Sequence, residues 1–149
     1  MTDLTKLSVR ELETMMDNAR KRSGLPGAQD AYRAAAIELF KRHGADRDDP
    51  VLAGCWGAIG LADRARYERT GKRLKSNHSL ASIKRNGELA FMTACALGRT
   101  LGTGFDLLVE AGLGMCTVEY VVAANATAFP DDAVQSARAR LAAGGVALP

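Results

Sequence analysis

Cations gathered in one part of the chain are the residues with the clearest chemical use. Between residues 64 and 85 lie eight Lys and Arg residues against one acid, Glu68. Serine, asparagine and histidine lie among them, and these side chains commonly hydrogen-bond phosphate oxygens. The stretch therefore predicts contact with a nucleic-acid backbone, DNA or RNA, with an affinity that falls as salt rises. The predicted contacts are Arg64, Arg66, Arg69, Lys72, Arg73, Lys75, Asn77, His78, Ser79, Lys84 and Arg85.

Tyr67 lies within the same stretch and could stack on a base. Two further interpretations of the chain stand beside nucleic-acid binding. The basic stretch can be a solvated face whose long side chains cover apolar neighbours. The chain can also be a protein-interaction or homo-oligomerisation module that packs small and apolar residues against a partner helix. The residues for that role are Gly54, Gly57, Gly60, Met15, Met16 and Trp56.

An enzymatic interpretation depends on histidine, of which the chain has two. His43 lies in the last turn of a predicted helix, where the helix dipole explains it without catalysis. His78 lies in the basic stretch and could serve a nuclease-like phosphotransfer reaction as a general base, but no carboxylate is near it in sequence. An enzyme is thus the third hypothesis, after the two binding functions.

Motifs for cofactors and metals are incomplete. Gly102 and Gly104 lack the third glycine and the preceding strand of a dinucleotide fingerprint, and the chain has no Walker lysine. Residues 46–49 resemble the start of a calcium loop but lack its glycine and its closing glutamate. The three cysteines are widely spaced among apolar residues, which favours three buried thiols over a zinc site or disulfides. We therefore expect no cofactor and no metal.

A second pattern lies further along the chain. Gly112 is followed by the apolar Leu113, and Val118 and Val121 recur at the spacing of anchors in a following helix. In these positions the stretch 105–125 resembles the helix-turn-helix unit of bacterial repressors, which implies that its second helix reads DNA. The stretch departs from that family at Leu108, where the motif usually has Ala, and at Glu119, in a second helix without Lys or Arg. An ordinary αα-hairpin with a glycine turn is the alternative.

Helix signals divide the rest of the chain into short segments. Ser8 and Glu11 form a capping box for a helix that ends before Gly24 and Pro26. A second helix is predicted over 28–43, with Gly44 as a left-handed stop. Asp49 and Pro50 open a third helix that reaches residue 70 and ends at Gly71. Its three glycines each cost about 1 kcal/mol relative to alanine, so we expect a neighbouring helix to approach that face closely.

The second half of the chain continues in the same way. Ser79 is predicted to cap the fourth helix, and residues 86–87 to divide it from a fifth that ends near Gly98. Thr103 is predicted to open the next helix and Thr117 the one after it. The last helix is predicted over 131–143, with residues 144–149 as a frayed tail. The prediction is an all-α, compact single domain of seven or eight short helices spanning residues 1–149.

Composition agrees with a folded protein. The chain is 47% hydrophobic and 25% charged, which is typical of globular proteins rather than disordered segments. Its net charge of +3 comes from residues 51–100, which carry nine basic and three acidic groups. The longest apolar run is too short to cross a bilayer and the N-terminus lacks a signal-peptide core, so we expect no membrane association and a cytoplasmic protein.

Overall fold

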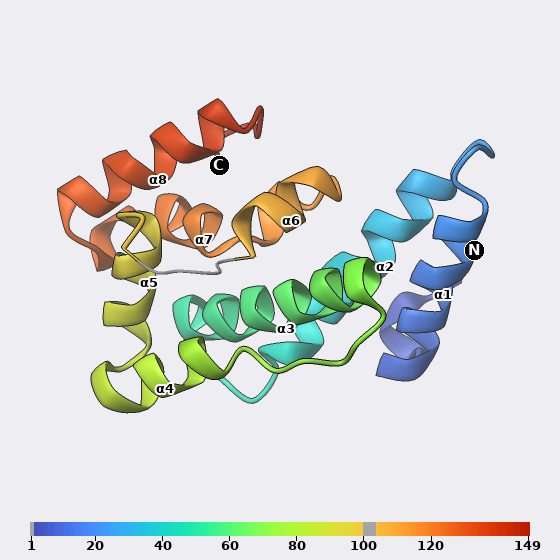
Figure 1. The fold of residues 1–149 in the computed structure, drawn as a ribbon, viewed down its shortest axis with the longest axis horizontal. Coiled ribbons are helices and arrows are strands. Elements are labelled where there is room, and N and C mark those ends of the chain that lie inside the picture. Colours follow the sequence, from blue (N-terminus) through green and yellow to red (C-terminus); the bar gives the residue numbers. More distant parts are fainter. Residues whose placement is uncertain (1, 100–103) are drawn as a thin grey trace.

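Every regular element of the structure is a helix. The computed structural model describes residues 2–99 and 104–149, and within these ranges it has eight α-helices, three short 3₁₀ turns and no strand (Figure 1). The helices are α1 (Val9–Lys21), α2 (Ala28–His43), α3 (Pro50–Thr70), α4 (Asn77–Asn86), α5 (Glu88–Ala96), α6 (Phe105–Glu110), α7 (Val118–Ala124) and α8 (Asp131–Ala143). The all-α prediction is confirmed. None of the described helices has the combination of length and apolarity that crossing a membrane requires.

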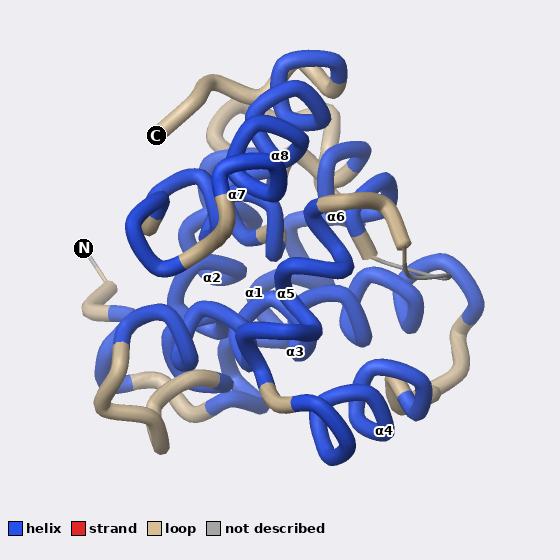
Figure 2. The backbone as a smooth tube through the Cα atoms, turned by 90° about the vertical axis from the view of Figure 1, so that its left-hand side faces the viewer, coloured by secondary structure: helices blue, strands red, loops and turns tan. Residues whose placement is uncertain are grey.

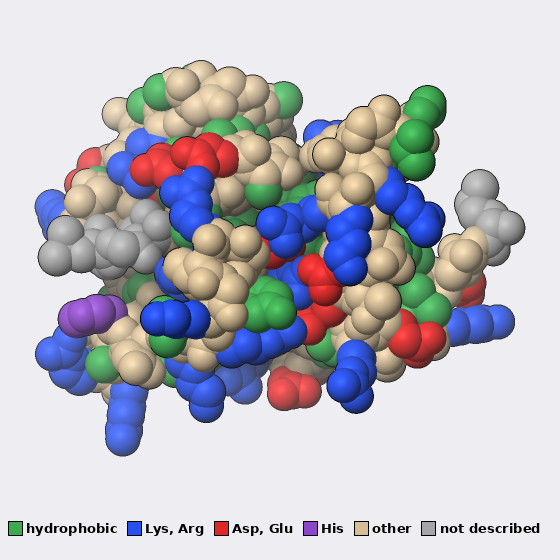
Figure 3. All heavy atoms as spheres, turned by 45° about the vertical axis from the view of Figure 1, so that its right-hand side comes forward, with side chains coloured by type: hydrophobic (Ala, Val, Ile, Leu, Met, Phe, Trp, Pro, Cys, Tyr) green, Lys and Arg blue, Asp and Glu red, His purple; other side chains and the backbone are tan. Residues whose placement is uncertain are grey.

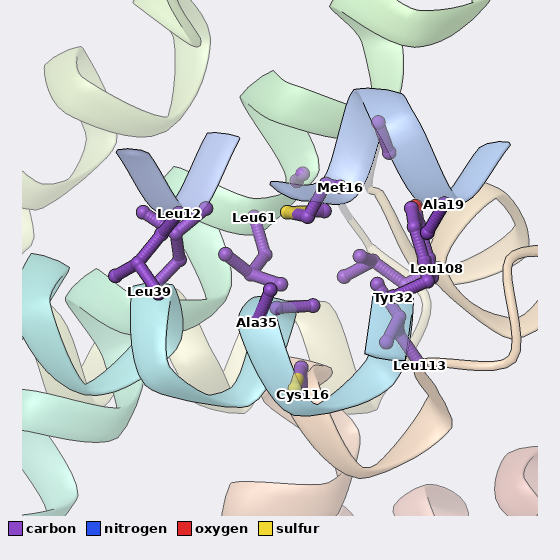
Figure 4. Close-up of a cluster of buried hydrophobic side chains, with 13 residues drawn as sticks. Leu12, Met16, Ala19, Tyr32, Ala35, Leu39, Leu61, Leu108, Leu113 and Cys116 are labelled. Carbon is purple, nitrogen blue, oxygen red and sulfur yellow. The ribbon is translucent and has the colours of Figure 1, made fainter. Parts of the chain in front are cut away.

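The central helix α3 joins two clusters of buried side chains. Its C-terminal half contributes Leu61 to a cluster formed with α1, α2 and the α6 region (Figure 4). Its N-terminal half contributes Cys55 and Ile59 to a second cluster with α5, α7 and α8. Because apolar residues occur on all sides of α3, it has no single polar face and is largely covered by its neighbours (Figure 1).

Local sequence signals place most helix ends where they were predicted. The Ser8–Glu11 capping box is formed, and the Asp49 side chain accepts hydrogen bonds from the first amides of α3. Gly71 ends α3 in the left-handed region, with φ +73°. The Asn86–Gly87 break separates α4 from α5. The predicted start at Thr103 lies outside the described residues, and α6 begins at Phe105.

Three local predictions differ from the structure. Gly44 has φ −97°, so it is not a left-handed stop; its lack of a side chain instead lets it lie against the backbone of Ala53. The fourth helix begins at Asn77 after Ser76, which puts Ser79 inside the first turn rather than at the cap. The tail after α8 is docked in part, since the Val146 side chain packs against Gly114.

The glycines of α3 allow the close approach that their cost predicted. A Cβ at Gly57 would lie 2.6 Å from the carbonyl oxygen of Phe40 in α2, and one at Gly60 would overlap the ring of His43. On the other side of α3, a Cβ at Gly54 would lie 2.8 Å from Val121 of α7. The prediction of a neighbouring helix on this face is confirmed, with α2 and α7 as the neighbours.

Candidate nucleic-acid interface

The structure divides the predicted phosphate contacts into two groups, and Arg64 is the extreme case of the first. Its residue is only 4% exposed. Nη2 lies 2.5 Å from Asp17 of α1, and Nε lies 3.0 Å from Glu68, one turn further along α3. This side chain therefore links α1 to α3 through ion pairs and does not face a phosphate backbone.

Three other arginines of the stretch are also ion-paired. Arg66 Nη1 lies 2.7 Å from Asp63 Oδ1. Arg69 bridges to Glu110 of α6 at 2.5 Å, and Arg73 to Glu13 of α1 at 2.9 Å. These acids lie in α1, α3 and α6, so the fold partly neutralises the positive charge that appears uncompensated along the sequence. Sequence reasoning missed these acids as partners because 41 and 60 residues separate Glu110 and Glu13 from the arginines that they neutralise.

Two of these arginines lie close to the ring of Tyr67. The guanidinium carbon of Arg73 lies 4.2 Å from the ring centroid, and that of Arg64 lies 5.3 Å from it. Cations at these distances are attracted to the ring face. The base stacking predicted for Tyr67 would therefore have to displace Arg73.

The second group of cations is solvent-exposed. Lys72 and Lys75 lie in the connector between α3 and α4, and Lys84 and Arg85 lie in the last turn of α4. Within residues 2–99 and 104–149 none of these four side chains forms an ion pair. Lys and Arg side chains gather along the lower edge of the face in Figure 3, the edge where Figure 1 places α4 and the connector.

Helix α4 turns one polar face to solvent. Leu80 and Ile83 lie partly buried, whereas the exposed positions recur every three or four residues along the other side. These exposed positions are Asn77, His78, Ala81, Lys84, Arg85 and Asn86. No residue of α4 is fully buried, and the helix lies at the edge of the molecule in Figure 2. The predicted contacts Asn77 and His78 thus share a surface with Lys84 and Arg85.

A polar cluster fixes the start of α4 against α3. The hydroxyl of Ser76 donates a hydrogen bond to Asp63, and Arg66 donates to both of them, at 2.7 Å to Asp63 and 2.8 Å to Ser76. Because its hydroxyl is engaged there, Ser76 does not cap the helix. The cluster therefore positions α4 while leaving the amides of its first turn without a side-chain partner.

The histidines do not form a catalytic pair. His78 is exposed, and within the described part of the chain no carboxylate hydrogen-bonds to it. The His43 ring lies against Gly60 of α3. Burial against α3 lowers the pKa of His43, and the nearby Glu13 and Asp63 oppose that shift only in part. Packing on a neighbouring helix, rather than charge at a helix end, explains this residue.

The segment that resembles a helix-turn-helix unit forms α6 and α7, joined through Gly112 at φ +78°. The seven-residue α7 has four buried residues, among them Val121 and Val122. Glu119 is 2% exposed and paired with Arg140 of α8 at 3.1 Å. A recognition helix must present side chains to the major groove, and α7 is instead packed against α3, α5 and α8.

Glu119 supplies a test of this packing. Burial raises its pKa, although Arg140 acts in the opposite direction. When the pKa of a carboxyl group is higher in the folded than in the unfolded state, the free energy of unfolding falls as pH rises from the unfolded pKa through the folded pKa. We expect the stability of the native protein to fall relative to Glu119→Gln as pH is raised from 4 toward neutrality, measured by urea unfolding at each pH. A difference that is independent of pH would contradict the burial of an ionising Glu119.

The residues considered for a protein-interaction module are mostly internal. Met16 is fully buried against α2, and the glycine face of α3 is covered by α2 and α7. Trp56 is partly exposed, but its indole N–H donates to Glu88 at 3.3 Å and Arg47 lies over its ring. The fold itself supplies the partner helices that these residues were predicted to need.

All three cysteines are buried, as their apolar neighbours predicted, and none forms a disulfide within the described residues. Burial raises the pKa of Cys55 and of Cys116 to about 12. Such thiols stay protonated at neutral pH and are poor nucleophiles.

Comparison with family models, curated proteins and solved structures finds no match to this chain, so its geometry alone carries the functional argument.

Proposed function

We propose that this protein is a small nucleic-acid-binding regulator or accessory factor without catalytic activity. It binds the phosphate backbone through α4 and the connector before it. The contacts are Lys72, Lys75, Asn77, His78, Lys84 and Arg85. The observation that carries this proposal is the division among the cations. The arginines of α3 and Arg73 are neutralised by acids of the fold, whereas four exposed cations of the next segment are not.

The arrangement suits a backbone better than a base edge. A helix of ten residues is about 15 Å long, so its exposed face can follow several phosphates of one strand. Lys84 and Arg85 lie at one end of this face, and His78 with the first-turn amides lies at the other. Groups of this kind position a protein on nucleic acid without reading its sequence, so we expect weak sequence preference.

Salt dependence measures how many of these cations are used. For duplex DNA each phosphate neutralised contributes about −0.9 to the slope of log K against log salt concentration. Four free cations predict a slope of about −3 to −4, whereas all eight basic residues of the stretch would give about −7. Fluorescence anisotropy of labelled duplex and single-stranded DNA and of RNA, titrated from low to moderate salt, gives this slope. Undetectable binding at low salt would refute the proposal in favour of a solvated face.

Charge reversal locates the interface. The variants Lys72→Glu/Lys75→Glu and Lys84→Glu/Arg85→Glu should each weaken binding at least about tenfold, because two phosphate contacts become repulsions. The matched control is Lys6→Glu/Arg10→Glu, which makes the same change of charge at exposed positions near the start of α1. Thermal unfolding checks that each variant folds. Equal loss in the control would mean that only net charge matters and that α4 is not the interface.

A further inference from the structure

A groove beside the connector is lined by a buried guanidinium group that is not fully satisfied. The groove has a volume of about 450 Å³ and lies between α1, the end of α2, α3, the connector and Leu80 of α4. Arg64 lines it. Nη1 of Arg64 is buried and has no hydrogen-bond partner within the described residues, and Oε2 of Glu13 lies 4.0 Å from it.

A buried guanidinium N–H without an acceptor is costly, because it loses its hydrogen bond to water and gains none in the protein. Glu13 does not meet the need because its carboxylate, which accepts hydrogen bonds from Arg73 at 2.9 and 3.3 Å, lies 4.0 Å from Nη1, beyond hydrogen-bond range. The other two acids on Arg64, Asp17 and Glu68, bind Nη2 and Nε and leave Nη1 open. An acceptor from outside the chain would complete the set.

The groove has the other features of a small-ligand site. Its volume falls within the range of such pockets, which are mostly apolar with a few placed polar groups. Ile59, Leu80 and the rings of Tyr67 and Trp56 supply apolar and aromatic surface. Arg73 and Lys75 supply two further cations at its edge.

The charges of the lining select the class of ligand. The lining has three cations, Arg64, Arg73 and Lys75, and two carboxylates, Glu13 and Asp63. Asp17 and Glu68 also pair with Arg64. With this many acids nearby, an anion of single charge is favoured over a phosphate dianion, which would meet stronger repulsion from them. A planar carboxylate matches the fork of a guanidinium group.

We propose that this groove binds a small organic monocarboxylate with an apolar body, whose carboxylate accepts hydrogen bonds from Arg64 and Arg73. The side chain of Arg73 contacts Glu13 and the ring of Tyr67, but it is 59% exposed. Because it is exposed, it can change conformation to admit the ligand. The carboxylate then takes the place of Glu13 as the partner of Arg73. This site shares Lys75 with the proposed phosphate contacts but includes neither Lys84 nor Arg85, and it does not depend on nucleic-acid binding.

The chain provides its own probe of the groove, because Trp56 is the only tryptophan. We expect cyclohexanecarboxylate and hexanoate to change the fluorescence of Trp56 in a saturable way, with dissociation constants of about 1 mM or below. Cyclohexanecarboxamide, which has the same shape without the charge, should bind at least about tenfold more weakly. No saturable change with either acid up to about 10 mM, or equal binding of the amide, would overturn the proposal.

Variants test the two arginines. Arg64→Lys retains one charge but loses the guanidinium fork, and it should weaken carboxylate binding at least about tenfold if it folds. Arg73→Gln removes an exposed contact, frees Glu13 to approach Arg64 and should weaken binding by a similar factor. Arg69→Gln is the matched control on α3, since Arg69 pairs with Glu110 away from the groove. Unchanged affinity in Arg73→Gln, or equal loss in Arg69→Gln, would refute the site.

The variant Lys84→Glu/Arg85→Glu should bind the carboxylate with the affinity of the native protein, so the failure of one proposal can be told apart from the failure of the other.

Discussion

Replacing Arg64 by Ala should lower the free energy of unfolding by about 3–5 kcal/mol. The side chain of Arg64 is 3% exposed and lies within 3.0 Å of both Asp17 and Glu68. Its removal leaves Glu68, itself only 9% exposed, without its closest cation. A buried ion pair that loses one partner costs far more than it contributed as a pair, because the remaining charge stays desolvated. Urea unfolding followed by circular dichroism measures the change.

The matched control for this prediction is Arg69→Ala, five residues further along α3. Arg69 and Glu110 form an ion pair at 2.5 Å, but their side chains are 61% and 60% exposed. Exposed pairs contribute about 0–1 kcal/mol, so this variant should unfold almost like the native protein. Similar losses in both variants would mean that Arg64 is not the buried fastening between α1 and α3 that the structure shows.

The second large effect is expected at Gly57, where Val should lower the free energy of unfolding by about 3 kcal/mol. At an exposed helical position the loss of glycine would be favourable, because glycine costs about 1 kcal/mol relative to alanine. Here a Cβ would lie 2.6 Å from the carbonyl oxygen of Phe40 and 2.8 Å from its ring. The carbonyl group of Phe40 belongs to the backbone of α2 and cannot move aside as a side chain could. The helices α2 and α3 would therefore have to separate and expose part of the core that they share.

Gly24→Ala is the control, because nothing lies within 4 Å of a Cβ there and its φ is not positive. This change should be neutral or slightly stabilising, since it reduces the freedom of the unfolded chain. Thermal unfolding of the two variants beside the native protein tests the contrast. A Gly57→Val protein as stable as the Gly24→Ala protein would contradict the close contact of α2 with α3.

The sequence by itself determined the helices, because most helix ends depend on residues close together in the chain. The Ser8–Glu11 box, the Asp49 cap and the left-handed Gly71 need no distant partner. The glycines of α3 also predicted a close neighbour, although not which helices it would be. The error at α4 has the opposite cause. Ser79 was predicted as the cap, whereas α4 begins at Asn77, after Ser76, whose hydroxyl donates to Asp63 of α3 instead of capping the helix.

The candidate site could be predicted only as a region. Sequence located the cations and His78, but it could not separate cations that are ion-paired in the fold from those that are not. Arg64, Arg69 and Arg73 have partner acids 47, 41 and 60 residues away, which no local pattern reports, although Arg64 also pairs with Glu68 one turn along α3. Tertiary structure alone decided which positive charges remain for a partner, because charge compensation depends on distance in space, whereas a charge count depends on distance along the chain.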